Sequence, residues 1–300
     1  MKHIHRLLAV GLAALVLFGT PVAASAHRRS ASDVTVYGLT TSQRIVTFSL
    51  DSPQSVQNNV AVQGLARGDR AIGFDRRPAN DTFYTVAMSR SGAALYTVDP
   101  TTGQTSLVAP LVTAPTATSP NRTPVMLNGK EFGVDFNPAA DALRVVSDTG
   151  QNLRIIPSAR AAADGTALQP GDTFTDAAIN RAGVTVPGVT GVGYTNNDTD
   201  PATATTLYDI DSQRDELSIQ NPPNAGTLTN TVPLSEQTGP RVGFDIRTTS
   251  GGDLAVASLT RRVGPSIRTR IVVVDLATGN VDSQGQLRRT VVLRDIALAK

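Results

Sequence analysis

The chain has 300 residues, of which 40% are hydrophobic, and it contains neither cysteine nor tryptophan. Its three histidines, His3, His5 and His27, all lie close to the N-terminus. A folded body without histidine or cysteine excludes Ser-His-Asp and Cys-His catalysis, histidine-ligated zinc and disulfide bonds. Any chemistry must therefore use Asp, Glu, Arg, Lys, Tyr, hydroxyl or backbone groups.

The first 26 residues have the pattern of a secretory signal peptide. Lys2 and Arg6 form a basic start, followed by an apolar run over residues 7–18. Small residues then lead to a predicted cleavage between Ala26 and His27. The apolar run is too short to predict a membrane span. We expect a secreted protein, extracellular or periplasmic, of a bacterial type.

The charge of the mature chain is balanced. Removing residues 1–26 takes away Lys2 and Arg6 but no acid, so 27 basic and 25 acidic residues become 25 and 25. This balance argues against nucleic acid as a partner. We expect a flexible start over residues 27–33 and one domain over residues 34–300, which is long enough to bury a large core. A monomer is expected.

Strand patterns dominate the domain. Short runs rich in β-branched and aromatic residues alternate with Gly, Pro, Asn and Asp. Helical patterns are confined to residues 158–164 and 176–182, each long enough for a turn or two. One motif recurs along the chain. It reads Gly73-Phe74-Asp75, Gly133-Val134-Asp135, Gly193-Tyr194-Thr195 and Gly243-Phe244-Asp245.

Each copy of the motif begins a group of short strands, and a long-period repeat of this kind predicts a β-propeller. The groups span residues 71–109, 132–168, 191–233 and 241–286. Each reads as four antiparallel strands. The fourth strand of the second group is expected near residues 165–168.

The two ends of the domain complete each other. Runs over residues 34–39, 45–50 and 56–63 match the second, third and fourth strands of a group whose first strand is missing. A last run over residues 291–298 has no partner of its own. We predict that this C-terminal strand joins the N-terminal blade, which removes open sheet edges. The expected fold class is all-β, a propeller of five four-stranded blades.

The innermost strand of each blade lines the axis of a propeller, and alternate residues face that axis. Asp75, Asp135 and Asp245 occupy equivalent places on three inner strands, whereas Thr195 and Ala297 fill the other two. Converging carboxylates could bind a hard cation such as Ca²⁺ or raise one another's pKa for acid–base work. The candidate funnel site is therefore Asp75, Asp135, Asp245 and Thr195.

A structural interpretation of the same aspartates is preferred. Each one stands before a polar turn, as in the segment from Asp75 to Pro78, where its carboxylate would accept that turn's own backbone N–H groups. On this interpretation no catalytic residue, metal or cofactor is assigned, and Ca²⁺ stays an open alternative.

Several segments resemble a bacterial secreted family known only as a domain of unknown function, numbered 4394. The resemblance covers nearly the whole mature chain, and its first segment is fairly specific. It implies a propeller-like β fold and no catalytic residues. The matching segments are residues 145–154 (VVSDTGQNLR), 193–197 (GYTNN), 206–211 (TLYDID), 220–224 (QNPPN) and 37–40 (YGLT).

Two functions remain open. The preferred one is a non-catalytic binding or scaffold module for an unidentified extracellular ligand or protein. The alternative is a carboxylate-dependent hydrolase, Ca²⁺-assisted or not, that acts on a glycan or lactone-like molecule in the central funnel. The chain has three glutamates, and of these only Glu131 lies near an inner strand. The absence of tryptophan removes the commonest sugar-stacking residue.

Overall fold

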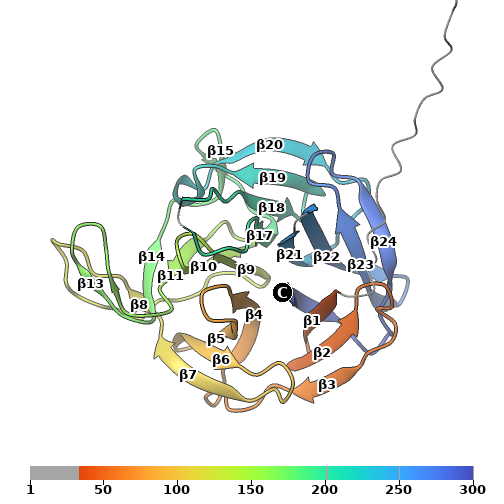
Figure 1. Ribbon diagram of the computed structural model, residues 1–300, viewed down its shortest axis with the longest axis horizontal. Coiled ribbons are helices and arrows are strands. Elements are labelled where there is room, and N and C mark those ends of the chain that lie inside the picture. The colour runs from red at the N-terminus through yellow and green to blue at the C-terminus, as the bar shows by residue number, and fades with distance from the viewer. Residues whose placement is uncertain (1–33, 201, 250, 300) are drawn as a thin grey trace, which may run out of the picture. The chain divides into compact units, whose positions relative to one another are not determined.

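The computed structural model describes residues 34–200, 202–249 and 251–299, and the predicted signal peptide and flexible start lie outside them. Five sheets surround one axis, antiparallel except for one parallel pair of outer strands in the third sheet, which confirms the predicted five-bladed propeller (Figure 1). We number the blades 1 to 5 in chain order. In each blade the strand named first below is the innermost.

The strands of each blade, from the axis outward, are as follows. Blade 1 consists of β25 (Leu293–Leu298), β1 (Thr35–Thr40), β2 (Arg44–Ser49) and β3 (Asn58–Ala61). Blade 2 consists of β4 (Arg70–Arg77), β5 (Thr82–Ser89), β6 (Gly92–Val98) and β7 (Thr105–Pro110). Blade 3 consists of β9 (Phe132–Asn137), β10 (Ala142–Ser147), β11 (Asn152–Ile155), β14 (Asp172–Thr175) and β8 (Val112–Thr113).

The other two blades are regular. Blade 4 consists of β17 (Val189–Tyr194), β18 (Leu207–Asp211), β19 (Glu216–Gln220) and β20 (Leu228–Pro233). Blade 5 consists of β21 (Arg241–Thr249), β22 (Gly252–Val263), β23 (Ser266–Val274) and β24 (Val281–Gln286).

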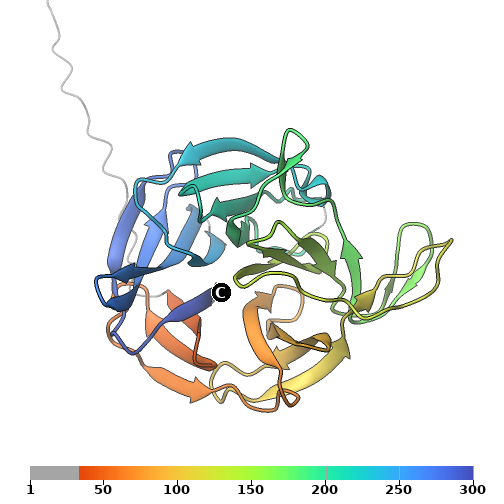
Figure 2. The same ribbon diagram turned by 180° about the vertical axis from the view of Figure 1, so that it is seen from behind.

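The C-terminal strand closes the ring, as predicted. β25 pairs antiparallel with β1, with Val36 opposite Leu298 and Leu39 opposite Asp295. The backbone N–H of Ala299 also donates to the carbonyl of Thr35 at 2.9 Å. Blade 1 is therefore built from both ends of the domain, and β25 lies beside the axis (Figures 1 and 2).

The core lies between neighbouring blades. Apolar side chains on facing sheets form separate clusters, for example Val86 and Leu95 of blade 2 with Val134 and Leu143 of blade 3. Other clusters join blades 1 and 5, blades 4 and 5, blades 3 and 4, and blades 1 and 2. Strands buried on both faces explain why the inner runs are apolar rather than alternating.

Blade 3 differs from the prediction. Its fourth strand is β14, while the expected segment forms β13 (Ala167–Leu168) in a hairpin with β12 (Arg160–Ala161). This hairpin and the loop after β8 project from the side of the ring (Figure 2). Arg122 of that loop anchors the projecting loop to β14, since its Nε lies 2.7 Å from Oδ1 of the buried Asp172.

The two predicted helical turns are absent. Residues 158–164 contain β12, and residues 176–182 contain β15 (Asn180–Arg181), which pairs with β16 (Val184–Thr185). Across the described ranges the helical content is a 3₁₀ turn, η2 (Pro223–Ala225). No helix there has the length and apolar character that a bilayer crossing requires.

Candidate functional site

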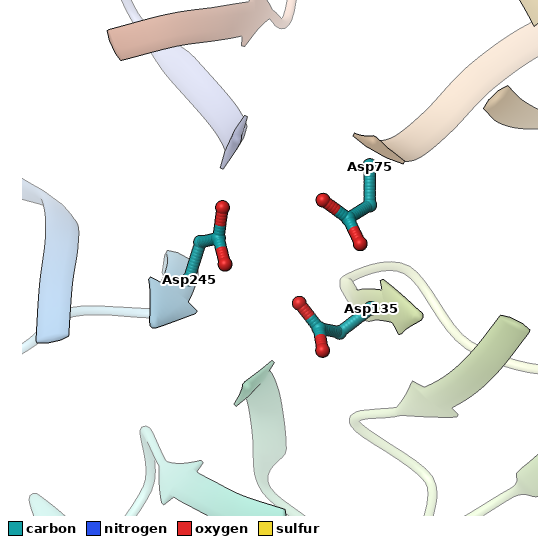
Figure 3. Close-up of side chains that lie close together, drawn as sticks. All are labelled: Asp75, Asp135 and Asp245. Carbon is teal, nitrogen blue, oxygen red and sulfur yellow. The ribbon is translucent and has the colours of Figure 1, made fainter. Parts of the chain in front are cut away.

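Three aspartates from three blades meet at one end of the axis. Asp75 comes from β4, Asp135 from β9 and Asp245 from β21, and all three are buried. One oxygen of each carboxylate lies within 4.8 Å of the others. Figure 3 shows the three side chains turned toward a common point. The sequence therefore located correctly the three acids that converge.

Each of these carboxylates bonds to a neighbouring blade. Asp75 Oδ2 accepts the backbone N–H of Phe136 at 2.8 Å, and Asp135 Oδ2 accepts that of Tyr194 at 2.8 Å. Asp245 Oδ2 accepts the backbone N–H of Leu298 at 2.6 Å. The side chains thus tie adjacent inner strands together at points where no sheet hydrogen bonds connect them.

The structural interpretation, in which each carboxylate accepts N–H groups of its own turn, therefore holds only in part, for Asp75 and Asp245. Asp75 does accept the N–H of the next residue, Arg76, through Oδ1 at 2.6 Å. Its other oxygen crosses to blade 3, as do the Oδ2 atoms of the other two acids to their own neighbours. The physical reason is that backbone N–H groups of an inner strand have no partner on the side facing the adjacent blade, so a charged acceptor there satisfies them.

Asp295 completes this pattern and was missed as a site residue. It occupies, on β25, the place that glycine takes in the repeated motif, and its Oδ2 accepts the N–H of Phe74 at 3.0 Å. A Cβ on Gly73 would lie 2.8 Å from that Oδ2 and 2.4 Å from Cγ2 of Val134. The glycine of the motif is thus required by the close approach of the adjacent inner strands.

Thr195 does not join the cluster. Its hydroxyl oxygen accepts the N–H of Thr206 at 2.9 Å, within its own blade. Asn197, two residues later, lines the space beside the acids instead. Its Oδ1 accepts the N–H of Thr248 at 2.7 Å, so blade 4 is joined to blade 5 by an amide rather than a carboxylate. The Asn196-Asn197 pair after the motif was the available sequence signal.

The space at the acids is small. The cavity lined by Asp75, Asp135, Asp245 and Asn197 has a volume of about 10 Å³, room for one particle the size of a water molecule. Ala299 and Leu298 of the C-terminal strand lie at its edge. An open funnel around the acids, as a glycan would need, is not what this geometry provides.

Burial controls the ionisation of the cluster. It raises the pKa of Asp75 well above the usual range, and the charge of Asp245 raises it further. Burial likewise raises the pKa of Asp135, followed by the charges of Asp75 and Asp245. The pKa of Asp245 is raised to about 6, again by burial, with the N–H of Leu298 opposing the shift. The charge of Arg76, which also lines the cavity, lowers the pKa of Asp75 and of Asp245 but does not cancel the effect of burial. The acids therefore retain protons at pH values where free aspartate has lost them.

The cluster fits a hard cation. Ca²⁺ takes carboxylate and carbonyl oxygens at about 2.3–2.6 Å, so two of its ligands can lie up to about 5 Å apart. The three carboxylate oxygens satisfy that limit. The amide of Asn197 stands beside them. Oxygen ligands without histidine or cysteine match calcium or magnesium chemistry rather than that of zinc or copper.

A second buried acid was also missed. Asp209 of β18 is wholly buried, and neither carboxylate oxygen has a hydrogen-bond partner among the described residues. Burial raises its pKa well above the usual range, and the charge of Arg144 opposes the shift. Its segment, residues 206–211, is one of those that resemble the family.

The chain matches a known family over most of its length. A family model described as a domain of unknown function, DUF4394, matches residues 44–297. No curated protein matches the chain. Among solved structures it is similar to a chain of a nidogen/laminin complex, with 13% identity, a TM-score of 0.45, and coverage of 89% of this chain and 98% of that one. It is also similar to a proposed 6-phosphogluconolactonase from Bacteroides uniformis, with 13% identity, a TM-score of 0.40, and coverage of 84% and 82%.

Proposed function

We propose that this chain, which belongs to the DUF4394 family of domains of unknown function, is an exported, non-catalytic binding or scaffold propeller. We further assign to its axial acids the binding of one hard cation such as Ca²⁺. The observation that supports the non-catalytic role and the cation is the small volume, about 10 Å³, of the cavity formed around Asp75, Asp135 and Asp245. It has room for one ion and not for a sugar ring or a lactone.

The hydrogen bonds of the acids support a structural role for the ion. Their carboxylates already link blade 2 to blade 3, blade 3 to blade 4 and blade 5 to blade 1. A cation held by all three would join these links at one point. It would also replace the protons that burial favours, because a divalent charge stabilises the ionised carboxylates.

A calcium titration of the chelator-treated full chain tests the cation. We expect millimolar Ca²⁺ to raise the Tm, since ligand binding to the native state adds RT ln(1 + [L]/Kd), about 2.7 kcal/mol at 100 times Kd. Asp135→Asn should reduce this shift strongly, whereas Asp282→Asn, at an exposed position on β24, should leave it unchanged. An unchanged Tm in the wild type at millimolar Ca²⁺ would contradict the assignment.

Asp135→Asn should also change the stability of the protein in the absence of calcium, and there the change should be a gain. Without calcium the variant should be more stable than the wild type at pH 7, because it removes a buried carboxylate whose pKa burial raises. A variant that merely disrupted folding would be less stable in both conditions. This contrast separates loss of the ion from loss of the fold.

The hydrolase alternative has one observation in its favour. Clustered acids with raised pKa values are the groups that acid–base catalysis uses. A panel of glycosides and lactones incubated with the mature protein tests it, together with a glycan and small-molecule binding screen. Turnover that Asp135→Asn abolishes would establish the hydrolase, and binding without turnover would support the binding module.

A further inference from the structure

The opposite end of the axis carries arginines instead of acids. Glu131 stands immediately before β9, four residues or roughly 13 Å along the strand from Asp135. Its Oε1 lies 2.9 Å from Nε of Arg241, the first residue of β21, and its Oε2 lies 3.1 Å from an Nη atom of Arg294 in β25. Neither blade 5 nor blade 1 is adjacent to blade 3 in the ring. Glu131 therefore reaches across the mouth of the axis.

Positive charge exceeds negative charge at this mouth. Arg70, the first residue of β4, is close enough to influence both Glu131 and Arg294 electrostatically. Two guanidinium groups, from blades 1 and 5, thus pair with the carboxylate of Glu131, and a third, from blade 2, acts on it electrostatically. A further acid, Asp148, is engaged by the backbone N–H of Lys130 at 2.9 Å.

The donors of these arginines are only partly used. Arg294 is 7% exposed, and its Nε has no hydrogen-bond partner among the described residues. The contact of Arg241 Nε with Glu131 is an ion pair without hydrogen-bond alignment, so that N–H is also unsatisfied. Burial lowers the pKa of Arg294, and the charges of Arg70 and Arg241 lower it further, against the effect of Glu131. Unsatisfied donors and mutual repulsion both favour an added anion.

Access and charge together define the ligand class. Arg294 and Glu131 form a buried floor, the Arg241 side chain is 28% exposed and Arg70 is exposed at the rim. Guanidinium groups bind planar and tetrahedral oxyanions through paired N–H donors. We infer that this mouth, formed by Arg70, Arg241 and Arg294 around Glu131, binds a small oxyanion, a phosphoryl or carboxylate group. This inference does not depend on a cation at the other end of the axis.

Calorimetric titration of the full chain with inorganic phosphate, and separately with succinate, tests the inference at constant ionic strength in chloride. Binding of either one supports the oxyanion site, and the tighter one identifies the group. Arg241→Gln and Arg70→Gln should each weaken binding about tenfold or more, which corresponds to the loss of one charge-assisted contact. Arg262→Gln, at the exposed tip of the β22–β23 hairpin, is the matched control and should bind as the wild type does.

Glu131→Gln provides the decisive variant because its expected effect has the opposite sign. Removing the internal carboxylate frees the arginines from their competing partner and should tighten anion binding. A purely structural role of this cluster predicts no such gain. The inference is overturned if neither anion binds at about 10 mM, a concentration well above a millimolar Kd, or if Arg241→Gln and Arg262→Gln bind alike.

Discussion

Asp209 is a carboxyl group that the folded protein buries completely, although burial disfavours its charged form. It lies on the same face of β18 as Leu207, which packs with Val146 of blade 3. No donor among the described residues reaches its oxygens. A buried carboxyl without partners favours its neutral form, and the raised pKa of Asp209 follows from that burial.

Asp209→Asn should therefore stabilise the protein at neutral pH. An acid with a raised native pKa contributes stability below its unfolded pKa of about 3.9 and loses it as pH rises toward the native value. The free energy of unfolding of the variant should exceed that of the wild type by an amount that grows with pH, by up to about 1.4 kcal/mol per unit. Urea unfolding at pH 4 and pH 7 measures this difference. Equal gains at both pH values would contradict the electrostatic cause.

At the scale of strands, β25 makes the clearest prediction. Its end lies beside the start of β1, with Leu298 opposite Val36, so a short turn could join residue 298 to residue 35 as a hairpin. A circular permutant with this join, opened in the exposed loop near Arg289, should retain cooperative unfolding with a Tm close to that of the wild type. Deleting residues 291–300 should abolish cooperative unfolding, because β1 then loses its inner neighbour. Circular dichroism during heating measures both.

The permutant and the deletion also separate two explanations of closure. If pairing with β1 is what matters, the order of the segments in the chain is irrelevant and only the deletion fails. A permutant as unstable as the deletion would show instead that the position of β25 at the end of the chain is required.

The sequence could predict the strands and their closure because both depend on short-range patterns. The repeated motif marks inner strands, and a group lacking one strand must find it elsewhere. The direction of each aspartate side chain could not be predicted, because it depends on the stagger between adjacent blades. Thr195 was misplaced for a different reason. Asp135 accepts the N–H of Tyr194, just as Asp75 accepts that of the residue after Asp135. Gly193 therefore stands at the aspartate place of blade 4, and Thr195 follows the end of β17. β14 was missed because its buried Asp172 is paired by Arg122, fifty residues away.

For the molecule as a whole, the axial acids predict an unusual response to pH. Asp245 has a pKa raised to about 6, and burial raises those of Asp75, Asp135 and Asp295 as well. The contribution of Asp245 to stability is therefore present near pH 4 and is lost as pH rises through about 6. The contributions of the other three acids are likewise lost as pH rises through their raised pKa values.

In a chelator, the Tm should fall between pH 5 and pH 8. Saturating Ca²⁺ should remove most of this fall, because the ion stabilises the ionised acids and competes with protons best at high pH. Differential scanning calorimetry at both pH values, with and without calcium, measures the four Tm values. A calcium shift that is larger at pH 5 than at pH 8 would refute the shared site.

The proposed export has its own test. Expression of the full chain in a bacterium should yield a protein outside the cytoplasm that begins at His27, since the small residues before it form the cleavage pattern. N-terminal sequencing of the extracellular or periplasmic protein checks this. A cytoplasmic protein that retains Met1 would contradict it.

The pairing of β25 with β1 also constrains the timing of folding. While the chain is being synthesised, the earliest blade has no inner strand until residues 293–298 leave the ribosome. Four blades can form locally, but the ring stays open, with unpaired edges on both sides of the gap, until β25 has been synthesised. For the proposed export, this late step would delay the compact state, so that the chain could cross a membrane before its ring closes.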